Sequence, residues 1–229
     1  MSDKVKIITT EDGSHSLYHE GLKETYHSFH GAYRESLHVF LLYGLDSWLA
    51  NNPNRYPLRV FEVGFGTGLN AWLTLVWAEQ YQIPVLYHTI EPFPLSEEVY
   101  SRLNFIHQND AIWHYHKYFE ALHKAAWNEG GPLSEYFNFK KDQVSLEEAQ
   151  LYPSDVVFFD AFAPSKQPEL WEKEMLEKVT NSMRPGGLFT TYSAKGQLKR
   201  DLRDLGLEVE SPPGPPGKKE MTRAWKPGQ

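Results

Sequence analysis

Three glycines at every second position, Gly64, Gly66 and Gly68, form the most informative part of the sequence. They follow an apolar run at residues 58–63 and precede a helical pattern of apolar residues that reaches Trp77. Because glycine has no Cβ, the backbone can turn sharply at these positions and lie directly against a ligand. The amide groups at the start of the following helix would face that ligand. The segment therefore predicts a strand, a tight turn and a helix, as in nucleotide-binding α/β folds.

The order of the glycines indicates which ligand the turn binds. A dinucleotide-binding turn has the pattern G-x-G-x-x-G, and Leu69 stands where its third glycine belongs. The pattern here is E-x-G-x-G-x-G, beginning at Glu62. It resembles motif I of class I S-adenosylmethionine-dependent methyltransferases, in which the turn takes the methionine end of the cofactor. On this resemblance Glu62, Phe65 and Asn70 join the three glycines as cofactor-binding candidates; a glycine-rich turn without a ligand is the alternative.

Two acidic residues follow the next strands that the sequence predicts. Glu91 ends the strand expected at 85–91, and Asp142 follows a weaker strand at 136–139. Ligands of open α/β sheets bind at the carboxyl ends of the strands. Glu91 there can accept hydrogen bonds from both hydroxyls of a ribose, and the same logic makes Asp142 a candidate for the adenine amino group. The alternatives are a solvated carboxylate at position 91 and a polar surface turn at 140–142.

Asp160 ends the most apolar strand of the sequence, expected at 155–160. A carboxylate at the ligand edge of a sheet needs polar partners, and a reacting amine would supply them, which makes Asp160 the catalytic candidate. The alternative is an aspartate that caps the following turn. Pro164 and Pro168 would stiffen that turn and hold Phe162 over a planar substrate.

The charge balance bears on the partner. The net charge is −7, with 23 Lys and Arg against 30 Asp and Glu, which argues against a surface coated with positive charge. A local cationic patch can still act, because salt screens charge beyond about 8–10 Å. Lys218, Lys219 and Arg223, with the cations at 195–203, predict such a patch for phosphates. The alternative is a solvated basic helix and tail.

The elements that must position these residues alternate between strands and helices, which predicts a mostly parallel sheet with helices on both faces. Residues 207–210 and 219–225 are expected to add an antiparallel C-terminal hairpin. A small N-terminal hairpin at 5–19 and a helix at 31–50 would precede the core. We therefore divide the chain into an N-terminal extension (1–54) packed on the core and a cofactor-binding core (55–229).

Composition narrows the class further. The sequence has no cysteine, which excludes disulfides and thiolate zinc sites, and its ten histidines lack convincing metal-ligand spacing, so we expect no metal. No run of about 18 apolar residues predicts a membrane span. The first residues lack the apolar stretch of a signal peptide. We expect a cytoplasmic protein.

Several segments together are similar to one family, the methyltransferase domain of bacterial enzymes that form 5-methylaminomethyl-2-thiouridine at the tRNA wobble position. The resemblance implies a class I (Rossmann-like) fold, S-adenosyl-L-methionine as cofactor and tRNA as partner. It implies N-methylation of the primary amine of 5-aminomethyl(-2-thio)uridine, with Asp160 orienting the amine and Tyr26 and Phe162 stacking on the base. The segments that carry it are 12–18, 26–40, 62–70, 91–95, 160–171, 184–187 and 218–221.

The sequence also departs from the pattern of that family. The best-known members carry a second, FAD-dependent oxidase domain that exposes the amine. With 229 residues, this chain is expected to perform methyl transfer alone, after a separate oxidase. Residues 111–140 match poorly. Three alternatives stay open at this point: an N-methyltransferase for a small-molecule or protein amine, an NAD-dependent oxidoreductase, and a non-catalytic RNA-binding protein.

Overall fold

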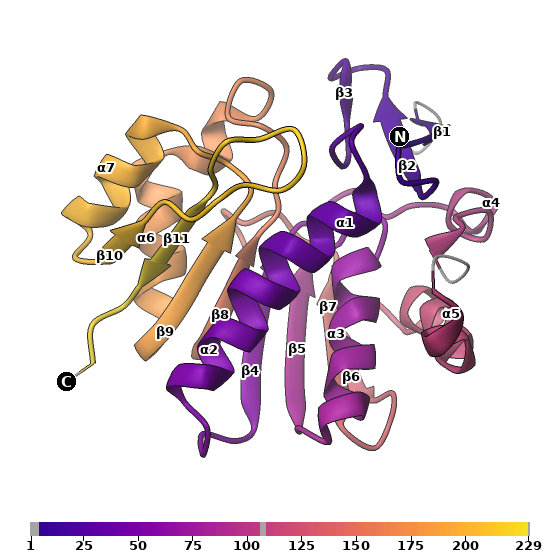
Figure 1. Cartoon of the computed structure of the whole chain (residues 1–229), viewed down its shortest axis with the longest axis horizontal. Coiled ribbons are helices and arrows are strands. Elements are labelled where there is room, and N and C mark those ends of the chain that lie inside the picture. The colour runs from indigo at the N-terminus through magenta and orange to yellow at the C-terminus, as the bar shows by residue number, and fades with distance from the viewer. Residues whose placement is uncertain (1–4, 106–108, 229) are drawn as a thin grey trace.

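The computed structural model describes residues 5–105 and 109–228, and an eight-stranded sheet runs through its centre (Figure 1). The strand order is β10-β11-β9-β8-β4-β5-β7-β6. The strands are β4 (Leu58–Val63), β5 (Val85–Ile90), β6 (Glu129–Pro132), β7 (Phe137–Asp142), β8 (Ser154–Phe159), β9 (Met183–Thr191), β10 (Glu208–Glu210) and β11 (Thr222–Trp225).

The five strands from β7 to β9 are parallel, and both edges of the sheet are antiparallel. The register pairs Val63 with Ile90 and with Phe159, and Ile90 with Asp142. The carboxyl ends of β4, β5, β7 and β8 therefore meet at one edge of the sheet. This register brings the segments that follow these strands, which hold the candidate site residues, to the same edge.

Alternating side chains of the strands build two apolar layers, one on each face, as the two-residue period of a strand requires. Val60 and Phe158 pack into one layer, and Phe61 and Phe159 pack into the other. Helix α3 (Leu69–Tyr81) and the N-terminal helical segment cover the first layer, while α6 (Lys173–Ser182) and α7 (Gly196–Asp204) cover the second. The predicted mostly parallel sheet with helices on both faces and a C-terminal hairpin is confirmed.

The N-terminal part forms a small antiparallel sheet followed by one long helical segment (Figure 1). The expected hairpin is β1 (Val5–Thr9) with β2 (His15–His19), and the two-residue strand β3 (Glu24–Thr25) extends it. The helical segment consists of α1 (Ala32–Ser36), a π-helical stretch (Leu37–Asp46) and α2 (Ser47–Asn51). Phe40, Leu45 and Trp48 of this segment are fully buried in the same apolar cluster as Leu58 and Trp72. The division at residues 54 and 55 stays a prediction.

The region between β5 and β7 differs most from the sequence-based expectation. The apolar pattern of the sequence predicts two helices there, near 96–105 and 111–127. The structure has a short α4 (Glu97–Tyr100), a 3-10 turn (Asp110–Tyr115) and a nine-residue α5 (His116–Lys124). Gly130, Gly131 and Pro132 are residues that break helices, and the sequence alone predicts only that the second helix ends there. In the structure they lie in the edge strand β6. Within the described ranges, the helices are too short or too polar to span a bilayer.

Candidate active site

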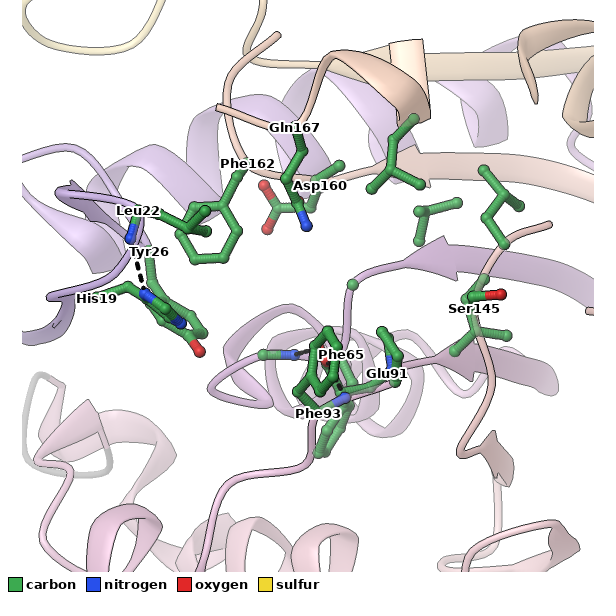
Figure 2. Close-up of a pocket in the computed structure, with 18 of the residues that line it drawn as sticks. His19, Leu22, Tyr26, Phe65, Glu91, Phe93, Ser145, Asp160, Phe162 and Gln167 are labelled. Atoms are coloured by element: carbon green, nitrogen blue, oxygen red, sulfur yellow. Dashed lines mark hydrogen bonds between the residues drawn. The ribbon is translucent and has the colours of Figure 1, made fainter. Parts of the chain in front are cut away.

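A cavity of about 640 Å³ opens at the carboxyl edge of the parallel strands. Its size lies within the range of about 300–1,000 Å³ that ligand pockets occupy. Asp160 and Phe162 lie on one side, and Phe65 and Glu91 face them from the other (Figure 2). Eight of the predicted site residues line it: Tyr26, Gly64, Phe65, Gly66, Asn70, Glu91, Asp160 and Phe162.

The glycine turn takes the backbone conformation that its sequence predicts. Gly64, Gly66 and Gly68 have φ values of +92°, +48° and +75°, a region that side chains disfavour. A Cβ at Gly64 would lie 2.8 Å from the carbonyl oxygen of Asp160, so the turn and the end of β8 touch backbone to backbone. Gly68 is the residue before the first turn of α3. The turn and the helix start therefore form one wall of the cavity, as expected.

Glu91 connects the glycine turn to the segment that follows β5. Its carboxylate accepts hydrogen bonds from the backbone amides of Gly66 (3.1 Å) and Phe93 (2.9 Å). Burial raises the pKa of Glu91, and these two hydrogen bonds lower it in part. Each carboxylate oxygen has a second lone pair. Glu91 can thus fix the turn and still accept two hydroxyl hydrogens of a ribose in the cavity.

Asp160 lies across the cavity from the glycine turn and is held by Asn70 of α3. The amide nitrogen Nδ2 of Asn70 donates to Oδ2 of Asp160 over 2.8 Å. Burial raises the pKa of Asp160 to about 7, and the negative charge of Glu35 adds to the shift, while the Asn70 bond and the charge of Lys218 oppose it. A carboxylate with this pKa accepts a proton from an amine far better than an ordinary aspartate does. The sequence assigned Asn70 to the cofactor, whereas the structure gives its amide nitrogen to Asp160.

Glu62 lies beneath the site and does not line the cavity. Its side chain is 1% exposed, and burial raises its pKa to about 8, so it is mostly uncharged at neutral pH. Among the described residues, Oε2 of Glu62 and Oδ1 of Asn70 are both buried without a hydrogen-bond partner. The predicted direct contact of Glu62 with the cofactor gains no support from this position.

Two residues that the sequence did not single out support the glycine turn from behind. His123 of α5 hydrogen-bonds through Nε2 to the carbonyl oxygen of Thr67 (3.1 Å) and stacks on Tyr100. Lys141 of β7, 1% exposed, donates from Nζ to the carbonyls of Leu122 and His123 at the end of α5 (2.9 and 2.6 Å). Burial lowers the pKa of Lys141 to about 8. His123 lies in a short helix and Lys141 in an apolar strand, and no pattern in the sequence indicates that the two residues contact each other.

The aromatic candidates Tyr26 and Phe162 do come together. Their ring centroids lie 4.9 Å apart in an edge-to-face arrangement. The loop that carries Phe162 is fixed by Trp171, whose indole N–H donates to the Phe162 carbonyl (2.8 Å), and by Tyr192, whose hydroxyl donates to the Ala161 carbonyl (2.9 Å). The two rings thus form a rigid apolar wall next to Asp160.

Asp142 lies at the expected strand end, but its side chain does not line the cavity. It accepts hydrogen bonds from the ammonium of Lys140 and from Nε2 of His88 (2.8 Å). Burial raises the pKa of Asp142, but these two partners outweigh it and hold the pKa below its ordinary value. Ser145 and Leu146, a few residues further on, border the cavity instead. The adenine contact predicted for Asp142 therefore stays a prediction without geometric support.

The two predicted substrate-binding lysines lie around a second cavity of about 380 Å³. Lys218 is already paired: its Nζ lies 3.0 Å from Oε2 of the buried Glu35 and 3.9 Å from the ring centre of Tyr192. Lys219 and Lys195 are exposed and line the same cavity. Of the other expected cations, Lys199 is buried and bound to Glu220 (2.7 Å). The cationic patch therefore offers fewer free lysines for phosphates than the sequence predicts.

The fold and the cavity together have the features of a class I S-adenosyl-L-methionine-dependent methyltransferase. The turn with its three glycines, the helix start that no side chain caps and Glu91 directly after β5 suit a ligand with an amino-acid end and a ribose. Consistently, residues 137–227 match a family described as S-adenosyl-L-methionine-dependent methyltransferase.

Within this class, the chain is similar to the methyltransferase part of the tRNA 5-methylaminomethyl-2-thiouridine biosynthesis bifunctional protein MnmC. It is 30% identical over 211 residues to MnmC from Idiomarina loihiensis, covering 86% of this chain and 35% of that protein. MnmC from Chromobacterium violaceum is 27% identical, covering 88% of this chain and 32% of that protein. The chain spans about a third of the length of these relatives. The crystal structure of MnmC2 from Aquifex aeolicus superposes with a TM-score of 0.78 at 27% identity, covering 98% of this chain and 72% of that one.

A substitution at Glu91 tests the assigned cofactor wall. We expect Glu91→Gln to weaken S-adenosyl-L-methionine binding by roughly 10- to 100-fold. The variant lacks the negative charge that strengthens the hydrogen bonds from the amides of Gly66 and Phe93 and the two expected from the ribose. Titration calorimetry measures this affinity directly. Glu98→Gln, on exposed α4, is the matched control and should bind as the unaltered protein does. Equal affinity of the Glu91 variant would contradict the assignment.

Proposed function

We propose that this protein transfers a methyl group from S-adenosyl-L-methionine to the primary amine of 5-aminomethyl(-2-thio)uridine at the wobble position of tRNA. The observation that carries the proposal is Asp160, a carboxylate with a pKa of about 7 that faces the cofactor wall across one cavity. The names of the similar MnmC proteins support the choice of tRNA as acceptor.

When bound against the glycine turn and Glu91, S-adenosyl-L-methionine would supply a methyl group on a positively charged sulfur, which the lone pair of a neutral amine could take in exchange for the S–C bond. Asp160 prepares that lone pair. A free alkylamine has a pKa near 10 and arrives as an ammonium ion, so Asp160 accepts one proton and holds the remaining hydrogens. Asn70 keeps the carboxylate in place, which supplies orientation before reaction.

Phe162 and Tyr26 support a planar acceptor. Two edge-to-face rings beside the reacting carboxylate offer an apolar surface for a base that has left its stack. The exposed Lys195 and Lys219 border the second cavity, which adjoins the loop that carries Phe162. We assign these two lysines to phosphate groups of the tRNA, and Lys218 through its ion pair to the support of this surface.

The substrate amine must be exposed by an earlier reaction. We propose that an FAD-dependent oxidase performs that step, and that both steps take place in the cytoplasm. The similar proteins are named bifunctional, which supports a second activity acting on the same nucleoside.

The direct test is transfer of labelled methyl groups from S-adenosyl-L-methionine to bulk tRNA from cells that lack this activity, followed by nucleoside analysis. We expect label in 5-methylaminomethyl(-2-thio)uridine. Label on a small-molecule or protein amine, with none on tRNA, would favour the second candidate acceptor and overturn the tRNA assignment.

The lysine pair gives a separate prediction. We expect the double variant Lys195→Ala, Lys219→Ala to raise the KM for tRNA several-fold and to flatten its salt dependence by roughly one to two phosphate contacts, with kcat nearly unchanged. Steady-state kinetics at several salt concentrations measure both. Lys173→Ala, an exposed lysine on α6, is the control. An unaltered KM and salt slope would count against the phosphate role.

A further inference from the structure

His19, the last residue of β2, lies in the wall of the main cavity. Its half-buried ring lies 6.0 Å from the ring of Phe162, edge to face. Figure 2 shows His19 beside Tyr26 at one end of the cavity, with Ser145 at the other end. The N-terminal sheet therefore contributes a polar ring to the aromatic end of the site.

The hydrogen bond of His19 fixes its tautomer. The backbone amide of Leu22 donates to Nδ1 over 3.1 Å. Because an amide N–H only donates, Nδ1 carries no hydrogen, and the neutral ring must carry its hydrogen on Nε2. In the part of the chain that the structure describes, this is the only hydrogen bond of the ring. His19 therefore has one N–H donor left for a molecule in the cavity.

The turn that sets this tautomer is tied to the loop that carries Asp160 and Phe162. Nζ of Lys166 donates to the carbonyls of Leu22 (3.1 Å) and Lys23 (3.2 Å). Lys166 follows the loop that carries Asp160 and Phe162. The donor of His19 and the acceptor of Asp160 are thus held in a common frame before any substrate binds, which favours a substrate of one orientation.

We propose that His19 is a specificity-determining residue whose Nε2–H donates to a carbonyl or thiocarbonyl group of the pyrimidine base, while the amine of the same base lies at Asp160. The inference rests on the proposed function. An ammonium group has only hydrogen-bond donors, so it can donate to the Asp160 carboxylate but cannot accept the Nε2–H of His19. A different group of the substrate must therefore accept from His19. A 5-aminomethyluracil offers both groups, with its C4 carbonyl next to the carbon that bears the aminomethyl group.

Two substitutions separate recognition from support of the turn. In His19→Asn, the side-chain oxygen can take the place of Nδ1 and accept from Leu22, but nothing reaches as far as Nε2. In His19→Gln, the longer amide places a donor near Nε2 and gives up the Leu22 bond. Each variant is assayed with tRNA from cells lacking the methyl transfer, carrying either a 2-oxo or a 2-thio wobble base, and cofactor binding is measured by calorimetry.

We expect His19→Asn to lower kcat/KM by roughly 10- to 100-fold with unchanged cofactor affinity, and His19→Gln to retain most of the activity. Equal losses on the two tRNAs would assign the contact to the C4 carbonyl, and unequal losses to the C2 group. Normal activity of His19→Asn, or loss in His19→Gln alone, would overturn the proposal. If the unaltered protein methylates neither tRNA, the proposed function fails first and this inference falls with it.

Discussion

Asp160→Asn lowers the rate of methyl transfer by roughly 10²- to 10⁴-fold, the range that a lost general base typically costs. The asparagine keeps the size of the side chain and can stay within reach of Asn70, which lies 2.8 Å away. It cannot accept a proton from an ammonium ion, and its amide directs hydrogens where the substrate's own hydrogens must lie. Single-turnover kinetics with saturating cofactor and tRNA measure the chemical step.

The pH profile gives the same prediction a second readout. Because burial raises the pKa of Asp160 to about 7, the carboxyl is protonated below pH 7 and cannot accept a proton there. We expect kcat/KM to fall about tenfold per pH unit below pH 7, with a break near pH 7. Asp160→Asn should lose that break, because its rate then follows only the ionisation of the substrate amine, whose pKa is about 10. Asp204→Asn, an exposed carboxylate paired with Lys173, is the matched control and should keep both rate and profile. Full activity of Asp160→Asn with normal cofactor binding would refute the role of Asp160.

Gly64→Ala should weaken cofactor binding and lower kcat/KM together, by roughly 10- to 100-fold. The alanine would have to adopt φ of +92°, which costs about 1–3 kcal/mol. Its Cβ would also lie 2.8 Å from the carbonyl oxygen of Asp160. That oxygen belongs to the backbone, so relief requires a shift of the strand end that carries the Asp160 carboxylate. One methyl group therefore disturbs the cofactor wall and the acceptor wall at once.

Calorimetry with S-adenosyl-L-methionine and a thermal melt of the same sample measure this effect. Gly131→Ala is the matched control, because a Cβ at Gly131 meets no atom within 4 Å and its backbone needs no positive φ. It should bind the cofactor normally. A Gly64→Ala protein with unchanged affinity and unchanged kcat/KM would show that the turn does not need glycine at this position.

Local patterns determined the core of the fold and half of the site. Apolar runs that end in glycine or an acidic residue place Gly64, Glu91 and Asp160 after β4, β5 and β8, where the structure has them. The reason is that strand ends and positive-φ turns depend on a few neighbouring residues. Once the strands are parallel, their carboxyl ends lie at the same edge of the sheet, independently of the lengths and positions of the helices.

The tertiary structure alone decided which side chains face the cavity and which pair with each other. The Asp142 carboxylate accepts hydrogen bonds from His88 and Lys140. Lys218 donates to Glu35, and Asn70 donates to Asp160. Apart from Lys140, which is two positions from Asp142 in the same strand, these partners lie from 54 to 183 positions apart in the chain, so no periodicity reveals them. The energy of a buried charge depends on every group that surrounds it. The sequence by itself could name Asp160 as the candidate carboxylate, and only the packed chain could raise its pKa and set His19 beside Phe162.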